Sequence, residues 1–152
     1  MTVTKDDIMA LRDRTGAGIM DCRSALNDAG GDMDKAVELL RQKGLATAAK
    51  KSGREANMGL VEAYVHGGRL GALIELNCET DFVARTDDFR QLAREIAMQA
   101  AANGAESVEA LKSQHYNRDT SKTIGDLISD TIAKVGENIV LRRVARFELG
   151  AE

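Results

Sequence analysis

The residues that could do chemistry in this chain are two cysteines, two histidines and a group of carboxylates. The possible metal ligands and nucleophiles are Cys22, His66, Cys78 and His115. They are not spaced like the ligands of a zinc site, and a structural role explains each of them better. Cys78 could act as a nucleophile only if the fold brings a histidine base such as His66 close to it. These four residues give little support for a metal site or a catalytic thiol.

The carboxylates lie in the polar stretch NCETDFVARTDDF, residues 77–89. They are Glu79, Asp81, Asp87 and Asp88. They match no cation-binding loop, and a solvated loop or the cap of a following helix accounts for them better. The stretch GAG at residues 16–18 lacks the Gly-Lys-Ser/Thr ending of a phosphate loop, and Asp21 stands where the GxGxxG pattern needs its last glycine. The sequence therefore predicts a protein without covalent catalysis, cofactor or metal.

Composition narrows the class of protein further. The 152 residues carry a net charge of −3, which gives no reason to expect a protein that binds duplex DNA. No apolar run is long enough to cross a membrane, and the first residues, MTVTKDDIMA, are too polar for a signal peptide. Two cysteines far apart in the sequence suit a reducing compartment. We expect a cytoplasmic protein that contacts neither membrane nor nucleic acid directly.

The first fifty residues predict three short helices separated by glycines. Thr4 is a good N-cap for the first helix, which should end before Thr15-Gly16. The apolar face of the second, over residues 19–29, is formed by Met20, Cys22, Ala25, Leu26 and Ala29. Asp32 caps the third helix, and Gly44 lies past its end. The basic, alanine-rich stretch LATAAKKSGREAN follows and is interpreted as a solvated helical linker. A contact with RNA or the ribosome is the less favoured alternative, since the stretch has no aromatic residue to stack on bases.

From Gly59 the apolar period changes to two, which is typical of strands. The pair Gly67-Gly68 predicts a two-residue hairpin turn. That turn places three apolar pairs on one face: Val65 with Leu70, Ala63 with Ala72 and Val61 with Ile74.

After this hairpin the period returns to that of helices. Thr86 predicts the cap of a helix that ends at Asn103-Gly104, with one apolar stripe formed by Phe89, Leu92, Ala93, Ile96, Ala97 and Ala100. A short helix around Val108 and Leu111 and a polar loop come next. Thr120 or Ser121 caps a further helix that ends at Gly136, and residues 138–149 alternate like a closing strand. The sequence predicts an α+β fold, with helices on one face of a small antiparallel sheet.

Three stretches carry a resemblance to a known family: RTGAGIMDCRSAL (residues 14–26), NCETDFVAR (77–85) and KVGENIVLRRVARFELG (134–150). Together, and in this order, they resemble the signatures of the bacterial elongation factor Ts family. Members of that family are guanine nucleotide exchange factors for elongation factor Tu. The resemblance implies two parts: residues 1–53 as a three-helix module like the ubiquitin-associated (UBA) domain, with the basic helical linker, and residues 54–152 as a core domain of the dimerisation type.

The resemblance also implies which residues contact the partner. The segment containing Thr-Asp-Phe would enter the nucleotide domain of elongation factor Tu near its phosphate and magnesium region. The residues implied there are Asp81 and Phe82 as the intruding pair, with Thr80, Val83 and Ala84 shaping the loop. Ile19 and Met20 would contact the nucleotide domain from the first module. The stretch of Val135, Gly136, Glu137 and Asn138 would face another domain of the partner.

Three questions stay open at the level of sequence. Phe82 could instead be a core residue on the face of the following helix. The chain has no room for the second core subdomain and helical hairpin of longer members, so it resembles a short form, and we expect a homodimer that gives a two-to-two complex with the partner. The closing strand, with Val140, Val144 and Phe147, is a candidate dimer edge. The alternative function is a non-catalytic module that binds elongation factor Tu or the ribosome without exchange activity.

Overall fold

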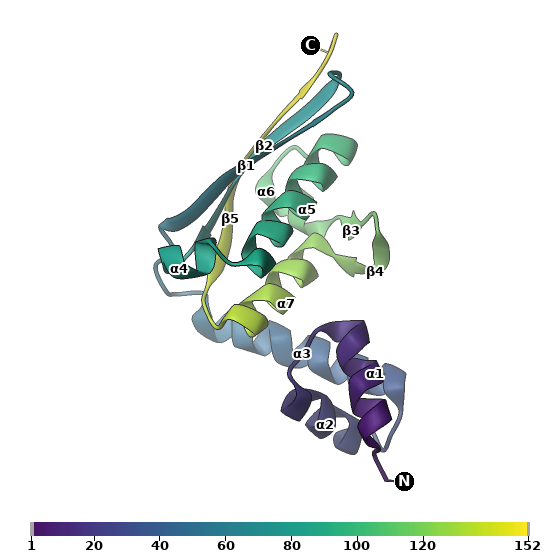
Figure 1. Ribbon diagram of the computed structural model, residues 1–152. Helices are drawn as coiled ribbons and strands as arrows, with labels where there is room; N and C mark the ends of the chain where they lie inside the picture. Colours follow the sequence, from purple (N-terminus) through teal and green to yellow (C-terminus); the bar gives the residue numbers. More distant parts are fainter. Residues whose placement is uncertain (1, 152) are drawn as a thin grey trace.

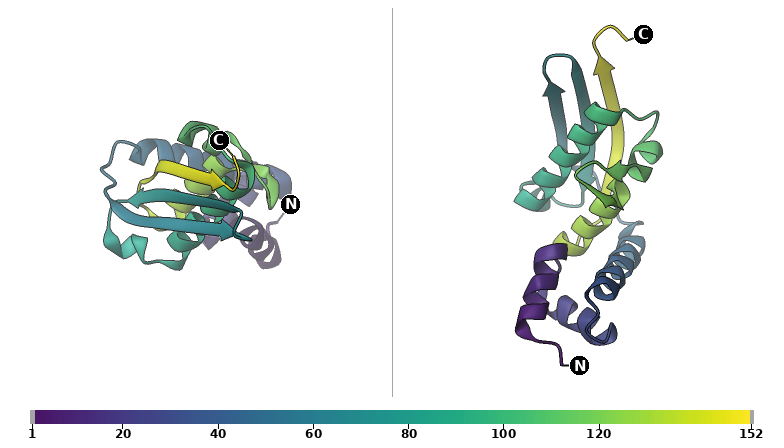
Figure 2. Two further views of the ribbon diagram at one scale, coloured as in Figure 1. Left: turned by 90° about the horizontal axis from the view of Figure 1, so that it is seen from above. Right: turned by 90° about the vertical axis from the view of Figure 1, so that its right-hand side faces the viewer.

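The computed structural model describes residues 2–151 and confirms the α+β class (Figure 1). Its elements are α1 (Lys5–Thr15), α2 (Ile19–Asp28), α3 (Met33–Lys51), β1 (Met58–His66), β2 (Leu70–Cys78), α4 (Asp81–Ala84), α5 (Asp87–Asn103), α6 (Val108–Ser113), β3 (His115–Tyr116), β4 (Asp119–Thr123), α7 (Ile124–Val135) and β5 (Ile139–Glu148). The molecule is elongated: the first helices lie at one end, and the hairpin tip and the C-terminus lie at the other (Figure 2).

The N-terminal helices surround a small core of their own. The Thr4 side chain accepts a hydrogen bond from the backbone N–H of Asp7, and the Asp7 carboxylate accepts one from the N–H of Thr4, which completes a capping box. The buried side chains of this core are Leu11, Cys22, Ala25, Leu26, Ala29 and Ala36. The predicted apolar face of α2 is correct except for Met20, which is 70% exposed. The buried side chains of α2 begin at Cys22, so its first turn lies outside this small core.

The third helix does not end at Gly44, as the sequence suggested. It continues without a break from Met33 to Lys51, so the stretch interpreted as a linker is half of one helix. Gly44 is buried because α7 packs directly on this side of α3. Ala48, one turn further on, packs against the main core, so this half of the helix is not simply solvated. Alanines at 46, 48 and 49 extend the helix at little entropic cost, and a single glycine is too weak a signal to stop it.

Gly44→Ala is expected to raise the free energy of unfolding by about 0.5–1 kcal/mol, because alanine costs less backbone entropy in a helix than glycine. A Cβ atom at this position would lie 3.9 Å from both Asp130 Oδ1 and the Ser129 carbonyl oxygen, which are ordinary contact distances. Urea unfolding measures the change. Gly59→Ala is the matched contrast, since Gly59 has φ +135° and a Cβ there would lie 2.1 Å from the Leu76 carbonyl oxygen. Destabilisation by both substitutions would contradict this packing of α3 on α7.

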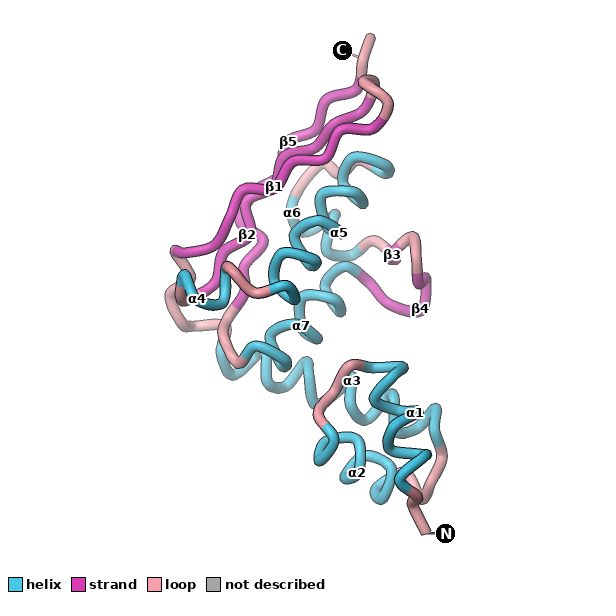
Figure 3. The backbone as a smooth tube through the Cα atoms, viewed as in Figure 1, coloured by secondary structure: helices cyan, strands magenta, loops and turns pink. Residues whose placement is uncertain are grey.

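The sheet has three antiparallel strands in the order β1–β2–β5, and one face of it is covered by helices (Figure 3). The predicted hairpin is present, but its register is wrong by one residue. The loop contains three residues, Gly67 to Arg69, and His66 pairs with Leu70. The carbonyl oxygen of Arg69 accepts a hydrogen bond from the N–H of Leu149, just beyond β5, which holds Arg69 in the loop.

The extra loop residue exchanges the two faces of β1, because a shift of one residue turns every side chain over. Tyr64 now pairs with Ala72 and Glu62 with Ile74, and the packed face of β1 carries Leu60 and Tyr64. The β1 residues predicted to share a face with Ala72 and Ile74 lie on the open face instead, whereas Ala72 and Ile74 themselves are buried. The exposed apolar side chains on that open face of the sheet are Val61, Val65, Leu73 and Phe147. We call these four the outer sheet patch.

The main core lies between the covered face of the sheet and α5, with α7 and α6 beside it. The predicted stripe of α5 is buried in full, and Phe89 is completely inaccessible to solvent. Thr86 caps α5 by accepting a hydrogen bond from the N–H of Phe89, as predicted. The polar loop expected after α6 is in fact a ribbon of β3 and β4, and the cap of α7 is Thr123 rather than Thr120 or Ser121. Thr123, the last residue of β4, forms a capping box with Asp126 three residues along the chain.

Candidate partner-binding surface

The Thr-Asp-Phe segment is a tight connection between β2 and α5 that contains one helical turn, α4. Thr80 is its N-cap, and its hydroxyl accepts a hydrogen bond from the N–H of Val83 at 3.3 Å. At the other end, the Thr86 hydroxyl donates a hydrogen bond to the Val83 carbonyl oxygen at the end of this turn. The same hydroxyl accepts one from the N–H of Phe89 and so caps α5. The segment is therefore a defined structure, held by a side-chain hydrogen bond at each end.

Phe82 points away from the protein. Its side chain is 82% exposed, whereas Val83 and Ala84 beside it are buried against β1, β2 and α5. A single helical turn can bury only one side, and the two small apolar residues occupy that side. The idea that Phe82 is a core residue is thus contradicted, while Phe89 fills the core position. Single exposed apolar side chains are common on protein surfaces, so the notable feature of Phe82 is its place on a fixed turn within the Thr-Asp-Phe segment.

Asp81 lies next to Phe82 at the start of the same turn. Its carboxylate forms an ion pair with Arg85 at 2.7 Å, four residues along. Both side chains are well exposed, so the pair adds little to stability. No role for Arg85 was predicted. Its position one turn after Asp81 means that the carboxylate is oriented but remains available on the surface.

The turn after α7 lies against the start of the Thr-Asp-Phe segment. The Glu137 carboxylate accepts hydrogen bonds from the N–H groups of Glu79 (3.1 Å) and Thr80 (3.0 Å) and from the Thr80 hydroxyl (2.8 Å). Asn138 is buried and donates its backbone N–H to the Glu79 carboxylate at 2.8 Å. Two segments that are far apart in sequence, and that were predicted to contact different parts of the partner, therefore meet in one place.

The other predicted contact residues lie elsewhere. Ile19 and Met20 begin α2 and are 49% and 70% exposed. They belong to the N-terminal helices, whereas α4 lies beside the opposite end of α3 (Figure 1). Val135 is the last residue of α7, and Gly136 follows it in a left-handed conformation with φ 76°. The structure thus groups the candidates into two surfaces, one on α2 and one around α4.

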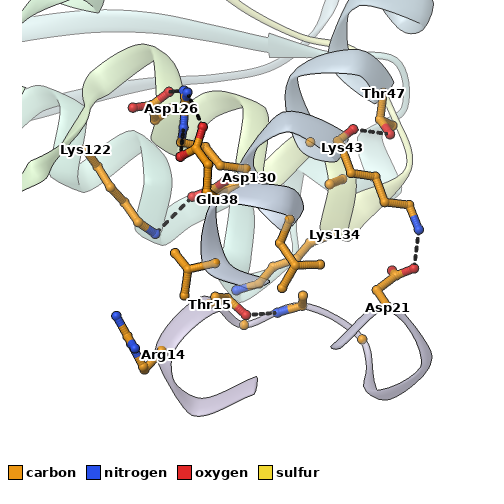
Figure 4. Close-up of a pocket in the computed structure, with 18 of the residues that line it drawn as sticks. Arg14, Thr15, Asp21, Glu38, Lys43, Thr47, Lys122, Asp126, Asp130 and Lys134 are labelled. Carbon is orange, nitrogen blue, oxygen red and sulfur yellow. Dashed lines mark hydrogen bonds and ion pairs between the residues drawn. The ribbon is translucent and has the colours of Figure 1, made fainter. Parts of the chain in front are cut away.

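The crevice between the N-terminal helices and the core was not expected from the sequence (Figure 4). It has a volume of about 580 Å³ and is lined by five basic and five acidic side chains among others. These charges largely pair with one another: Lys122 with Asp130 at 3.1 Å, Arg41 with Asp126 at 3.6 Å, and Lys43 with Asp21. Such a balanced lining suits a contact between two parts of the chain better than a site for an anion or a cation.

Cys78 is not placed for nucleophilic chemistry. It is completely buried, and its thiol donates a hydrogen bond to the Thr80 carbonyl oxygen at 3.1 Å. Burial, followed by the negative charge of Glu137, raises the pKa of the Cys78 thiol to about 11. Cys78 and His66 stand at opposite ends of the hairpin, about 25 Å apart along the strands. His66 instead bonds to the Tyr64 hydroxyl through Nδ1 at 3.1 Å, so the Cys78–His66 hypothesis is wrong.

The raised pKa of the Cys78 thiol predicts that the protein loses stability at alkaline pH. Its folded pKa of about 11 lies above the usual value of 9.0, so the folded state holds the proton more tightly. The stability that the folded state gains from holding this proton is complete below pH 9 and is lost as the pH rises towards 11. The free energy of unfolding should fall between pH 8.5 and 10.5 by about 2 kcal/mol more in the parent than in Cys78→Ser. Urea unfolding at several pH values measures this, and parallel pH profiles would contradict it.

Residues 2–151 contain no group of three or more histidine, cysteine, aspartate or glutamate side chains arranged to hold a metal ion. Within the same residues, none of the helices combines the length and the apolar character that a membrane span requires.

Comparison with known proteins shows the family. The model of the family described as "Elongation factor TS" matches residues 79–152. Relatives named elongation factor Ts include those of Moorella thermoacetica, 46% identical over 95% of this chain and 94% of the relative, and Caldanaerobacter subterraneus, 44% identical over 97% of each chain. That of Thermodesulfovibrio yellowstonii is 39% identical over 99% of this chain and 98% of its own. The chain belongs to the elongation factor Ts family, whose members are translation elongation factors.

The alignments also show that this chain is shorter than its relatives. The alignment with the Caldanaerobacter subterraneus relative extends over 194 positions, more than the 152 residues of the chain, while covering 97% of both. The relative therefore has additional residues inside the matched region. This agrees with the interpretation of the chain as a short form.

Proposed function

We propose that this chain is a guanine nucleotide exchange factor that binds elongation factor Tu, in its GDP-bound and nucleotide-free states, and promotes release of GDP. The observation that carries the proposal is the exposed Phe82 on the braced turn α4, within the stretch that resembles the family's signature. No covalent step and no cofactor of its own is needed. The chain would act in the cytoplasm, where translation takes place.

The mechanism follows from the reciprocity of binding. A factor that binds the nucleotide-free partner more tightly than the GDP-bound partner must weaken GDP binding by the same factor. Phe82, buried in an apolar slot of the partner, contributes about 1.5–3 kcal/mol. If that slot opens only when the phosphate and magnesium contacts are disturbed, this free energy favours release of GDP. Asp81 adds a negative charge where the partner must hold magnesium and phosphate, and Val83 and Ala84 anchor the turn in the core.

The N-terminal helices supply a second contact in this proposal. We assign residues 1–53 to a UBA-like module and residues 54–152 to the core domain, and the separate small core around Leu11 and Leu26 supports the division. The exposed apolar pair Ile19 and Met20 would then dock on the nucleotide domain. Because α3 is continuous and packs on α7, the module would be held at a fixed distance from α4.

A substoichiometric assay tests the function. Elongation factor Tu loaded with a fluorescent GDP analogue is mixed with excess unlabelled GDP, and this chain is added at one hundredth of the partner's concentration. Acceleration of release under these conditions means that each molecule of the chain acts repeatedly, as an exchange factor must. Stable binding to elongation factor Tu in a pull-down without any acceleration would favour the non-catalytic interaction module.

We further propose that two copies associate, giving a two-to-two complex with the partner. The structure suggests a different surface from the strand edge expected from the sequence. Val144 packs against the main core, whereas Phe147 is 80% exposed and belongs to the outer sheet patch. Facing sheets bury such patches well, because side chains from the two inner faces interdigitate.

Light scattering on a size-exclusion column tests the dimer. The parent is expected at twice 16.4 kDa, and Leu73→Glu at 16.4 kDa, because Leu73 lies on the middle strand and a charge there would be buried without a partner. Lys50→Glu, on the solvated side of α3, is the control and should remain dimeric. A parent mass of 16.4 kDa at all micromolar concentrations would contradict the dimer.

A further inference from the structure

Both oxygens of the Glu137 carboxylate accept hydrogen bonds from other residues of this chain. One oxygen accepts two backbone N–H groups, those of Glu79 and Thr80, and the other accepts the Thr80 hydroxyl. Hydrogen bonds to an ionised acceptor are stronger than neutral ones and fix geometry more firmly. The sequence separation between these partners is 57 to 58 residues, so the interaction joins two distant segments. This arrangement differs from that of a side chain kept free for a partner.

A further hydrogen bond between the same two loops runs in the opposite sense. The Asn138 backbone N–H donates to the Glu79 carboxylate at 2.8 Å, so the two loops exchange hydrogen bonds. The buried Asn138 side chain donates to the Arg54 carbonyl oxygen at 2.9 Å, and the Arg54 guanidinium lies 3.6 Å from the Glu79 carboxylate. The turn after α7, the start of the Thr-Asp-Phe segment and the chain just after α3 thus form one polar cluster, which we call the clasp.

Thr80 connects the clasp to the exposed phenylalanine. Its hydroxyl donates to Glu137 and simultaneously accepts the N–H of Val83. Because its single hydrogen is engaged by Glu137, a lone pair faces Val83, which is the orientation that an N-cap requires. Glu137 therefore holds the first residue of α4 through both its backbone and its side chain. Phe82 comes two residues later, and its direction depends on how this turn begins.

We infer that Glu137 is a positioning residue that fixes α4 so that Phe82 projects into the partner, and that it does not itself contact the partner. The inference deepens the exchange function proposed above and rests on it. It differs from what the family resemblance implied for the stretch 135–138, namely a separate contact. Without the clasp, the start of α4 would lose its fixed orientation in the free protein, and binding would have to supply the cost of ordering it.

A double-mutant cycle on exchange rate separates the two roles. Glu137→Gln keeps the side-chain size but replaces one accepting oxygen with a group that cannot accept. We expect it to lower the second-order rate of GDP release about tenfold, equivalent to about 1.4 kcal/mol. In the Phe82→Ala background the same change should have no further effect. Equal losses in both backgrounds would mean that Glu137 contacts the partner directly, and would overturn the inference. Glu109→Gln, an exposed carboxylate on α6, is the matched control and should have no effect.

Two substitutions of Thr80 test the same connection between Glu137 and α4. Thr80→Ser keeps the hydroxyl and should retain nearly the parent rate, whereas Thr80→Val removes it at almost constant volume and should behave like Glu137→Gln. Combining Thr80→Val with Glu137→Gln should cost less than the sum of the two single changes, because they remove one shared interaction. Strict additivity, or an inactive Thr80→Ser, would contradict the clasp.

NMR relaxation of the free protein gives a reading that does not require elongation factor Tu. The amides of Asp81 and Phe82 should have order parameters near 0.85 in the parent and below about 0.6 in Glu137→Gln. Order parameters that do not change would overturn the positioning role, whatever the exchange assay shows. If the parent fails to accelerate GDP release, the proposed function fails. A mobile α4 in Glu137→Gln would still establish the clasp.

Discussion

Phe89→Ala is expected to lower the free energy of unfolding by about 3–5 kcal/mol. Phe89 lies on the face of α5 that packs on the sheet and is completely buried, and it is the largest such side chain in the described part of the protein. Removing its ring takes away buried apolar area and leaves a cavity that the surrounding helices fill only in part. Since domains of this size have total stabilities of about 5–15 kcal/mol, the variant should be close to unfolding at growth temperature.

Urea unfolding followed by circular dichroism measures this loss. Phe89→Leu is the conservative control and should recover more than half of the lost stability, because it refills most of the cavity. A change below about 1 kcal/mol for Phe89→Ala would mean that the core is organised differently from this description.

Phe82→Ala is expected to have the opposite profile: the rate of GDP release falls about 10–100-fold, while stability stays within about 0.5 kcal/mol of the parent. The ring is 82% exposed, so the folded state loses little when it is removed. The loss arises in the complex, where burial of the ring contributes about 1.5–3 kcal/mol. The two phenylalanines are seven positions apart, and the account predicts that one serves stability and the other serves function.

Leu149→Ala is the control for removing an exposed apolar side chain. Leu149 is 66% exposed and lies beyond the end of β5 that is remote from α4. It should leave the exchange rate unchanged. A comparable fall in rate for Leu149→Ala and Phe82→Ala would show that general surface hydrophobicity, rather than the turn α4, determines the activity.

The elements that were predicted correctly are those specified by local chemistry. Thr4 with Asp7 and Thr86 with its first-turn aspartates determine helix starts within four residues of sequence. The apolar stripe of α5 needs only its own periodicity, and it is buried as expected. Each of these signals lies within one element, so no knowledge of tertiary packing is required.

The errors occurred where tertiary contacts outweigh local signals. Gly44 is a reasonable helix stop in isolation, yet α7 packs on that side of α3 and the helix continues. The hairpin register depended on whether Arg69 belongs to the loop or to β2, and a contact from beyond β5 places it in the loop. Both faces of β1 carry apolar residues, so the sequence pattern alone could not choose between them.

The candidate surface was predictable in part. The resemblance to the family picked out Phe82, and no pattern of hydrophobicity would have shown that it is exposed. The interaction of Glu137 with Thr80 could not be foreseen, because the two residues lie at the ends of elements separated by α5, α6 and α7. The one available signal was that both belong to stretches resembling family signatures, which says that they matter but not that they meet.

The most direct test of the account is a stopped-flow measurement of the release of a fluorescent GDP analogue from elongation factor Tu, with the parent and Phe82→Ala compared over a range of concentrations. The parent should accelerate release in proportion to its concentration, and the variant should need about 10–100 times more protein for the same rate. Equal acceleration by the two proteins would contradict the role of Phe82, and no acceleration by the parent would contradict the exchange function itself.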